Sequence, residues 1–284
     1  MTTTAPSSAL QGMSGHLRLI CALDSRGVST LREQSFRAPI HLSKPHWDKD
    51  TLVLNVVNPT AGLLEDDRIT QDVLVESGAR LLLTMPGASR AHRVQSGWAA
   101  MEQRFRVADG AFLEVLPEVF IPQAGAAYRQ TTRLEVAEGG TLLFFETLAP
   151  GRTASGEVFQ YRRLDWHTDL WIGEQHAARE RLRLEPGTPP IAALMERFPT
   201  GYYAGILAVS SRLEKVSRAL EHLNELQSEE VWIGQSRLAH SSGWSLRILA
   251  QNAPVLRDAV HKVRRGLYEQ LGCETPELRR VAGR

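Results

Sequence analysis

Three adjacent carboxylates, Glu65, Asp66 and Asp67, form the densest group of potential metal ligands in the sequence, and Arg68 follows them directly. Hard oxygen ligands of this kind suit divalent cations, and carboxylates that crowd together raise one another's pKa. The same residues are typical of a solvated turn in which Arg68 is the counter-ion. Both interpretations stay open, and Asp66 and Asp67 are candidate metal ligands.

Histidine and cysteine offer fewer ligands. The nine histidines are scattered; His92 lies between Arg90 and Arg93, which favours a surface position over a role as a ligand, although it stays a candidate. The two cysteines, Cys21 and Cys273, provide neither a disulfide framework nor a multi-cysteine metal site. This usage fits a reduced, cytoplasmic setting.

A second segment that could carry function is Gly151-Arg152-Thr153-Ala154-Ser155-Gly156-Glu157. Its two glycines bracket small residues, and Arg152 and Glu157 could form an ion pair at its edges. A tight turn and an interaction surface fit this pattern equally well. Ser155 lacks the strand-to-helix context of a nucleophile, and the common zinc-protease, phosphate-loop and hydrolase signatures are absent from the sequence.

The composition is that of an ordinary globular protein, with 33 basic and 32 acidic side chains. There is no global field to attract nucleic acid or a membrane surface, and no run of about 18 apolar residues. Binding must therefore depend on local features.

The elements that position these residues are mainly strands. Val75-Glu76-Ser77-Gly78, Val107-Ala108-Asp109-Gly110 and Val136-Ala137-Glu138-Gly139 repeat one turn pattern, with the glycines 32 and 29 residues apart. Alternating stretches precede these turns and apolar stretches follow them, which indicates a strand, a turn and a strand in each repeat. The sequence thus predicts a mainly β fold of stacked sheets built from repeated hairpins.

The last third differs in character. One helix is predicted from Ser211, with Glu214 completing a capping box, and a second from Asn252 to Gly272. Strands are predicted over 158–166, over 170–184 with alternation at 179–184, and over 244–250. We expect a disordered tail at 1–14 and one domain at 15–284, with a β-rich body at 15–185 and an α/β closing section at 186–284. A basic side of the second helix, formed by Arg257, Lys262, Arg264 and Arg265, suits a partner surface.

Four segments resemble motifs of the urease accessory protein family UreD, also called UreH. They are Asn58 to Arg68, Leu83 to Arg90, Leu116-Pro117-Glu118 and Gly151 to Glu157, in the order and spacing of that family. The resemblance extends from about Gly15 to the second helix. Glu65 and Asp66 replace glycines, Arg90 replaces a lysine, and Leu148-Ala149-Pro150 lacks the usual cysteine. The chain therefore resembles a divergent member, in which a cysteine cannot ligate nickel near Arg152.

The resemblance implies a non-enzymatic metallochaperone scaffold. Such a protein would bind apo-urease and, with UreF and UreG, support GTP-dependent nickel insertion, holding no cofactor stably while nickel passes through. Carboxylates suit such transit because weak sites exchange a divalent ion stepwise. The candidates for partner or nickel contacts are Asp67, Glu118, Glu146, Arg152 and Glu157, and the family-motif residues are Asn58, Pro59, Gly62, Arg68, Gly151 and Gly156.

Two other interpretations remain. A carbohydrate-acting enzyme on stacked sheets could use Asp66, Asp67 or Glu118 as acid and base, although the aromatic content of 7% is modest for sugar stacking. A purely structural scaffold would leave Glu157 paired with Arg152 and Asp67 capping its turn. The sequence favours the accessory protein over both.

Overall fold

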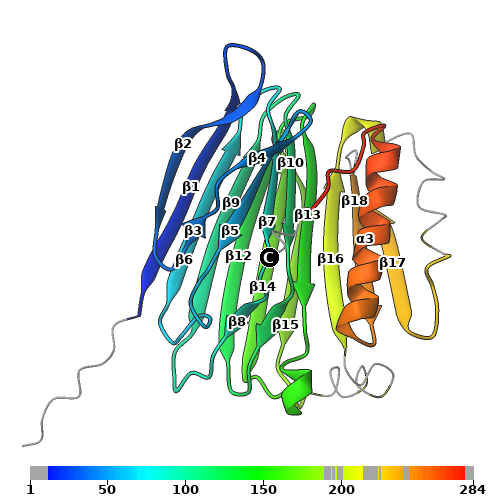
Figure 1. Ribbon diagram of the computed structural model, residues 1–284. Coiled ribbons are helices and arrows are strands. Elements are labelled where there is room, and N and C mark those ends of the chain that lie inside the picture. Colours follow the sequence, from blue (N-terminus) through cyan, green and yellow to red (C-terminus); the bar gives the residue numbers. More distant parts are fainter. Residues whose placement is uncertain are drawn as a thin grey trace, which may run out of the picture.

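The computed structural model describes residues 12–188, 193, 196, 201–213, 223, 225–238 and 243–278. Two β-sheets are stacked face to face, and a helix near the carboxyl terminus covers one end of the second sheet (Figure 1). The predicted tail falls largely on residues 1–11, outside the described residues, and the first strand already begins at Ser14. The division into a tail and one domain stays a prediction.

The first sheet has seven strands in the order β15-β14-β12-β9-β6-β1-β2. Its five central strands run parallel to one another, whereas β2 and β15 are antiparallel edges. The bounds are β1 Ser14–Leu23, β2 Ser29–Arg37, β6 Arg68–Val75, β9 Ala99–Val107, β12 Ala127–Val136, β14 Arg163–Ile172 and β15 Gln175–Leu184.

The second sheet has eleven strands, with β17-β18-β16-β13-β10-β7-β5-β3 as its main path. Strands β5, β7, β10 and β13 are parallel, and β16, β18 and β17 continue the sheet antiparallel. The bounds are β3 His41–Leu42, β4 His46–Asp48, β5 Thr51–Val57, β7 Arg80–Met85, β8 Ser89–Ala91, β10 Phe112–Pro117, β11 Phe120–Pro122, β13 Thr141–Leu148, β16 Tyr202–Val209, β17 Val231–Arg237 and β18 Gly243–Ala250.

The three glycine turns connect the two sheets, so the prediction of repeated hairpins is wrong. Strands β6, β9 and β12 lie in the first sheet, and the strands that follow them, β7, β10 and β13, lie in the second. The register explains the spacing: Val75 pairs with Val107, which pairs with Val136, and the offsets of 32 and 29 equal those between the glycines. Each repeat therefore stacks in parallel on the next. The mainly β class and the stacking are confirmed.

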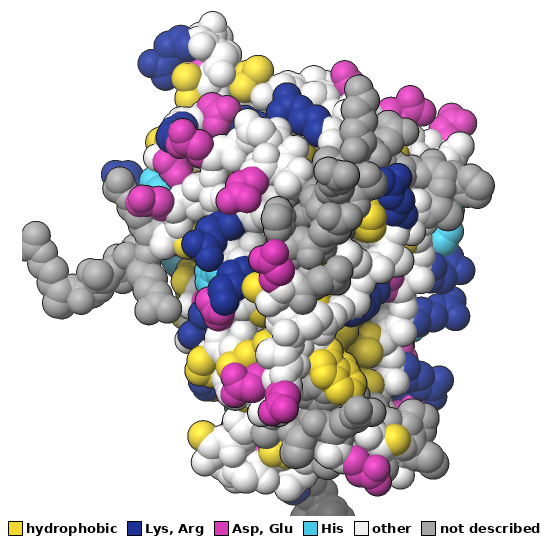
Figure 2. Space-filling model, turned by 90° about the vertical axis from the view of Figure 1, so that its right-hand side faces the viewer, with side chains coloured by type: hydrophobic (Ala, Val, Ile, Leu, Met, Phe, Trp, Pro, Cys, Tyr) yellow, Lys and Arg dark blue, Asp and Glu magenta, His cyan; other side chains and the backbone are white. Residues whose placement is uncertain are grey.

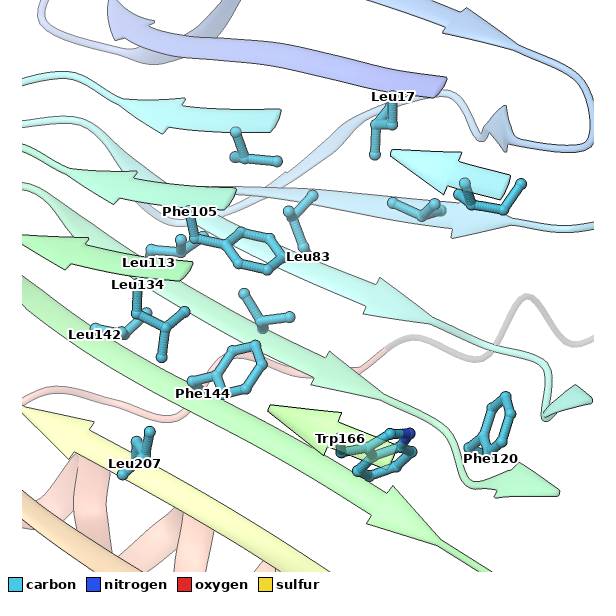
Figure 3. Packing of buried hydrophobic residues seen from close by; sticks show 14 of the residues in the cluster. Leu17, Leu83, Phe105, Leu113, Phe120, Leu134, Leu142, Phe144, Trp166 and Leu207 are labelled. Atoms are coloured by element: carbon cyan, nitrogen blue, oxygen red, sulfur yellow. The ribbon is translucent and has the colours of Figure 1, made fainter. Parts of the chain in front are cut away.

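The core lies between the sheets, where apolar side chains of both inner faces interdigitate. Figure 3 shows Phe105 and Leu134 of the first sheet packed toward Leu113 and Phe144 of the second. Phe105 and Phe144 have ring centroids 5.8 Å apart. The alternation of buried and exposed residues along β12 explains this layer, because one strand face enters the core and the other carries polar side chains.

Of the two predicted C-terminal helices, the described residues contain one, α3 (Ala253–Gln270). Asn252 caps it by accepting a hydrogen bond of 2.9 Å from the amide of Val255. The other prediction starts at Ser211, where the structure has a 3₁₀ turn, η2 (Ser211–Leu213), and most of its length, 214–222, lies outside the described residues. No helix of the described residues is long and apolar enough to span a membrane.

Helix α3 packs its apolar side on the outer face of the second sheet. Arg257, Lys262 and Arg265 are exposed as predicted, but Arg264 is only 3% exposed and its guanidinium binds the buried carboxylate of Glu114, with Nε 2.5 Å from Oε1. The prediction that Arg264 belongs to the exposed basic side is therefore wrong. Charges of both signs are spread over this side of the molecule (Figure 2).

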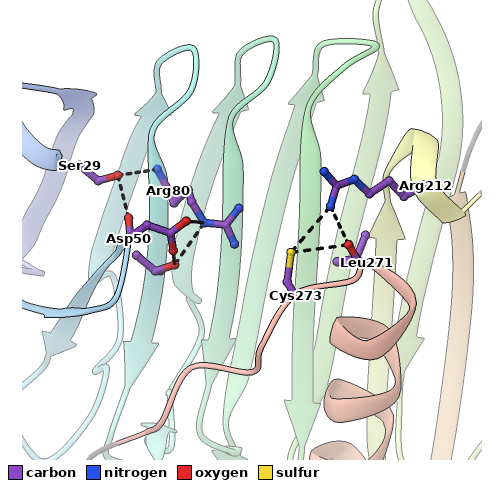
Figure 4. A network of polar contacts seen from close by, with 7 residues as sticks. Ser29, Asp50, Arg80, Arg212, Leu271 and Cys273 are labelled. Atoms are coloured by element: carbon purple, nitrogen blue, oxygen red, sulfur yellow. Dashed lines mark hydrogen bonds and ion pairs between the residues drawn. The ribbon is translucent and has the colours of Figure 1, made fainter. Parts of the chain in front are cut away.

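The segment after α3 runs back across the second sheet (Figure 4). Arg212 donates to the carbonyl oxygen of Leu271 at 2.7 Å, and further along the amide of Glu277 donates to Asp48 at 2.8 Å. These contacts hold the segment over the strands between α3 and β4.

Candidate functional site

Three of the four motif segments surround one cavity of about 340 Å³. They follow the carboxyl ends of β5, β7 and β10, which meet at one edge because these strands are parallel. The glycine turns lie at the opposite edge. The motif residues that line the cavity are Asn58, Thr60, Ala61, Gly62, Leu63, Met85, Gly87, Ala88, Ser89, Arg90, Pro117 and Glu118. The fourth segment, Gly151 to Glu157, is not part of this lining.

The motif loops support one another through the backbone. The amide of Leu63 donates to the carbonyl of Arg90 at 2.8 Å, and the amide of His92 donates to the carbonyl of Leu63 at 2.9 Å. Gly62 has a φ of +142°, and a Cβ there would lie 2.7 Å from the oxygen of Arg90. Glycine is therefore required at this position. Asn58 starts the same loop, accepting at 3.0 Å from the amide of Thr60.

Polar side chains from the first sheet form a row inside the cavity region. Gln103 donates to Gln71 at 3.2 Å and accepts from Thr132 at 3.0 Å. The Nε2 of Gln71 and the Nε1 of Trp166 are buried without a hydrogen-bond partner, and both residues line the cavity. Buried polar groups normally have partners, so these two donors are available to a polar molecule in the cavity.

Glu146 on β13 faces this row from the second sheet. Its carboxylate accepts from the amide nitrogen of Gln130 at 2.7 Å and from the hydroxyl of Thr168 at 3.5 Å. The pKa of Glu146 is raised to about 8, mainly by burial and also by the nearby carboxylate of Glu180, while Arg247 and the two hydrogen bonds offset part of the increase. Glu146 therefore holds its proton more strongly than an exposed carboxyl group does.

A second cavity, of about 540 Å³, adjoins the first at the open edge of the sandwich. Glu146 and Trp166 line both cavities. Glu180 of β15 and Arg247 of β18 line the second and form an ion pair with each other. The two cavities thus meet at a carboxylate.

Glu118 occupies a comparable position on another side. It lines the main cavity and also a smaller one, of about 70 Å³, beneath α3. Its carboxylate lies 3.5 Å from the guanidinium of Arg257 on α3. Glu118 and Glu146 are the predicted carboxylates that the structure brings to the same cavity.

The acidic triplet does not form an open metal site. Asp67 is 4% exposed, and its two oxygens accept from the amides of Met13 and Leu64 at 2.7 and 2.8 Å. Glu65 accepts from the amides of residues 95–97, which lower its pKa to about 2. Asp66 has a φ of +64°, a backbone conformation that glycine adopts most readily. Asp67 caps its turn through both carboxylate oxygens.

The Gly151 to Glu157 segment is a tight turn. Gly151 has a φ of +141°, and a Cβ there would lie 2.2 Å from the oxygen of Glu157. Glu157 pairs with Arg152 and accepts from the amide of Ala124 at 3.0 Å, contacts that lower the pKa of Glu157 to about 2. Gly156, with a φ of +74°, ends the 3₁₀ helix η1 (Thr153–Ser155). The turn holds Glu157 in place.

The remaining candidates lie apart from the cavity carboxylates. The Nε2 of His92 is 3.1 Å from the carbonyl oxygen of Ala61. Pro59 belongs to the motif loop, and Arg68 opens β6, where its amide donates to Met13 at 2.8 Å. The described residues contain no group of three or more His, Cys, Asp or Glu side chains that could hold a metal ion.

Sequence reasoning missed Gln130, Thr168, Glu180 and Arg247, which surround Glu146. One signal was available for Glu180. The alternation over 179–184 places Glu180 on the same strand face as Leu182 and Leu184. This pattern predicts that the acidic side chain of Glu180 points toward the core.

The chain is thus a β-sandwich of parallel repeats, with carboxylates where its cavities meet. The family model described as "UreD urease accessory protein" matches residues 13–282, so the chain belongs to this family. It is 39% identical over 262 residues to the urease accessory protein UreD of Opitutus terrae, covering 90% of this chain and 94% of the relative.

Two further relatives carry the same designation. UreD of Acetivibrio thermocellus is 28% identical over 86% of this chain and 94% of the relative. UreD 3 of Methylorubrum populi is 30% identical over 92% of this chain and 86% of the relative. The chain thus has the role of an accessory protein in urease maturation.

Proposed function

We propose that this protein is a cytoplasmic scaffold that binds apo-urease and, together with UreF-like and UreG-like proteins, supports GTP-dependent insertion of nickel. Nickel is its cargo and is not held as a resident cofactor. Family membership supports the maturation role. The main observation in support of the nickel route is the position of Glu146, which lines both cavities where they meet.

The chemistry of the cavity suits transit. Glu146 offers a carboxylate whose hydrogen-bond partners are a neutral amide and a hydroxyl, so no ligand set encloses a metal ion there. Nickel would be bound weakly by oxygen ligands and water, and passed on by exchange. Glu118 supplies a second carboxylate in the main cavity, where α3 meets the motif loops.

Reconstitution from purified components tests the route. Apo-urease, the UreF-like and UreG-like proteins, GTP and Ni²⁺ are combined with the wild-type chain, Glu146→Gln or Glu102→Gln. Glu102 is an exposed carboxylate on β9 and serves as the matched control. We expect Glu146→Gln to assemble with its partners and yet to load urease much more slowly, while Glu102→Gln behaves as wild type. Normal loading by Glu146→Gln would exclude the carboxylate route.

The maturation role has its own test. Deleting the gene should abolish urease activity and leave the urease subunits abundant, because the defect concerns metal loading and not folding. Full urease activity in the deletion strain at low nickel would contradict the role itself, whatever path the metal takes.

A further inference from the structure

Four residues form one row across the inner face of the second sheet. Glu146 of β13 pairs with Gly205 of β16, Gly205 pairs with Arg247 of β18, and Arg247 pairs with Gly234 of β17. Residues directly opposite each other in antiparallel strands point to the same face. Glu146 and Arg247 therefore face the same layer, with only a glycine between them.

The first sheet completes the cluster. Glu180 of β15 lies opposite Thr168 of β14, which donates to Glu146 at 3.5 Å. Arg247 forms its ion pair with Glu180 and donates to the hydroxyl of Ser245 at 2.9 Å, and that hydroxyl donates to Glu180 at 2.9 Å. The guanidinium of Arg247 thus interacts with one carboxylate of each sheet. It forms an ion pair with Glu180, and its charge lowers the pKa of Glu146 without a direct contact.

The position of Arg247 conflicts with free passage of a divalent cation. Its side chain is 36% exposed and lines the second cavity, whereas Glu146 lines both the second and the main cavity. Arg247 lies in the second cavity, and its charge acts on Glu146 at the junction. A divalent cation that reaches Glu146 from the second cavity therefore approaches the guanidinium, and like charges repel.

We propose that Arg247 is a tethered counter-cation that closes the junction between the two cavities and is displaced when nickel crosses it. In the closed state Arg247 neutralises Glu180 and reduces the attraction of Glu146 for metal. In the open state the two carboxylates are released to bind Ni²⁺ together. This inference rests on the proposed nickel route and adds its regulation.

A different role would leave the same contacts: the ion pair between β15 and β18 could only tie the two sheets together at the open edge. That role makes Arg247 important for stability and irrelevant to metal affinity. Nickel binding by the isolated, full-length chain separates the two, because it needs neither urease nor the partner proteins.

The experiment is equilibrium dialysis with ⁶³Ni²⁺ on the wild-type chain, Arg247→Met and Arg247→Gln, with thermal unfolding to confirm that each is folded. Arg247→Gln keeps donors for Ser245 without the charge. We expect both variants to bind Ni²⁺ at least about tenfold more tightly than wild type, which corresponds to about 1.4 kcal/mol. Adding Glu180→Gln to either variant should remove the gain. Arg18→Met, which removes an exposed arginine of β1 paired with Glu33, should leave the affinity unchanged.

An affinity within twofold of wild type in a folded Arg247→Gln or Arg247→Met chain would overturn the inference and leave the sheet-tie role. If both variants fail to fold, Arg247 is required to hold the sheets together, which also overturns it. Neither result touches the reconstitution with Glu146→Gln, so a failure of this inference is distinct from a failure of the nickel route.

Discussion

Glu114 and Glu146 lie on neighbouring strands, β10 and β13, yet they point to opposite faces of the same sheet and have opposite environments. Glu114 is fully buried beneath α3, where it accepts from Arg264 at 2.5 and 2.9 Å and from the hydroxyl of Tyr268 at 2.6 Å. Glu146 faces a cavity and accepts from a neutral amide and a neutral hydroxyl. One carboxylate is fully compensated, and the other is not.

The two environments give the two carboxylates different roles. The charge of Glu114 is neutralised by a guanidinium in direct contact, so the cluster fastens α3 to the sheet. Glu146 lacks such a contact, and its pKa rises to about 8 as a result of burial. The proposed nickel route would use this uncompensated carboxylate, and a cation that binds it must displace its proton.

The largest effect is expected from breaking the compensated site. Arg264→Met leaves Glu114 buried without its cation, which should lower the free energy of unfolding by about 3–5 kcal/mol. Chemical denaturation measures it, with the exposed neighbour change Arg265→Met as control. A loss below about 1 kcal/mol would mean that Glu114 and Glu146 do not differ as described.

For Glu146 we expect an effect on how the free energy of unfolding depends on pH. Because its folded-state pKa of about 8 exceeds the unfolded value of 4.5, the folded chain binds the extra proton, and stability should fall as pH rises between these values. The slope from this group is at most about 1.4 kcal/mol per pH unit. Glu146→Gln should flatten the profile of unfolding free energy against pH, and an unchanged profile would contradict the assignment.

Two glycines of one row give a matched pair. A Cβ on Gly205 would lie 2.9 Å from the hydroxyl oxygen of Tyr203, whereas a Cβ on Gly234 meets nothing within 4 Å. We expect Gly205→Ala to cost about 1 kcal/mol in unfolding free energy and to slow nickel loading of urease. Gly234→Ala should do neither. Equal loading rates for the two variants would show that the space beside Glu146 is not used.

The smallest effect belongs to the exposed motif turn. Arg152 and the amide of Ala124 lower the pKa of Glu157 to about 2, so this carboxylate stabilises the folded chain above pH 4.5, and the contribution is lost as pH falls toward 2. Glu157→Gln should lower the melting temperature slightly at neutral pH. The gap to wild type should shrink between about pH 5 and about pH 3; a gap that widens would refute the structural role.

The turn glycines show how far the sequence could predict the fold. The spacings of Gly78, Gly110 and Gly139 correspond to the offsets between stacked strands, so repetition and stacking were readable. The sequence did not show whether a turn closes a hairpin or leads to a second sheet, because both need the same chain reversal. The parallel pairing that decides it is made with residues about thirty positions away.

The site was predictable in part. Glu118 lies in a motif segment and Glu146 shortly before another, and the structure places both at the cavity. Asp67 and Glu157 lie in motif segments as well, but their carboxylates accept from nearby backbone amides and hold turns. Arg264 resembled an exposed basic residue, since its partner Glu114 lies 150 positions earlier and no local pattern connects them.

The most direct test of the carboxylate route is an anomalous difference map from a crystal of the wild-type chain soaked in millimolar Ni²⁺. We expect a partly occupied nickel peak in the inter-sheet cavity, in contact with the carboxylate of Glu146, and its loss in Glu146→Gln. Nickel found only on surface histidines such as His92, with nothing at Glu146, would contradict the account.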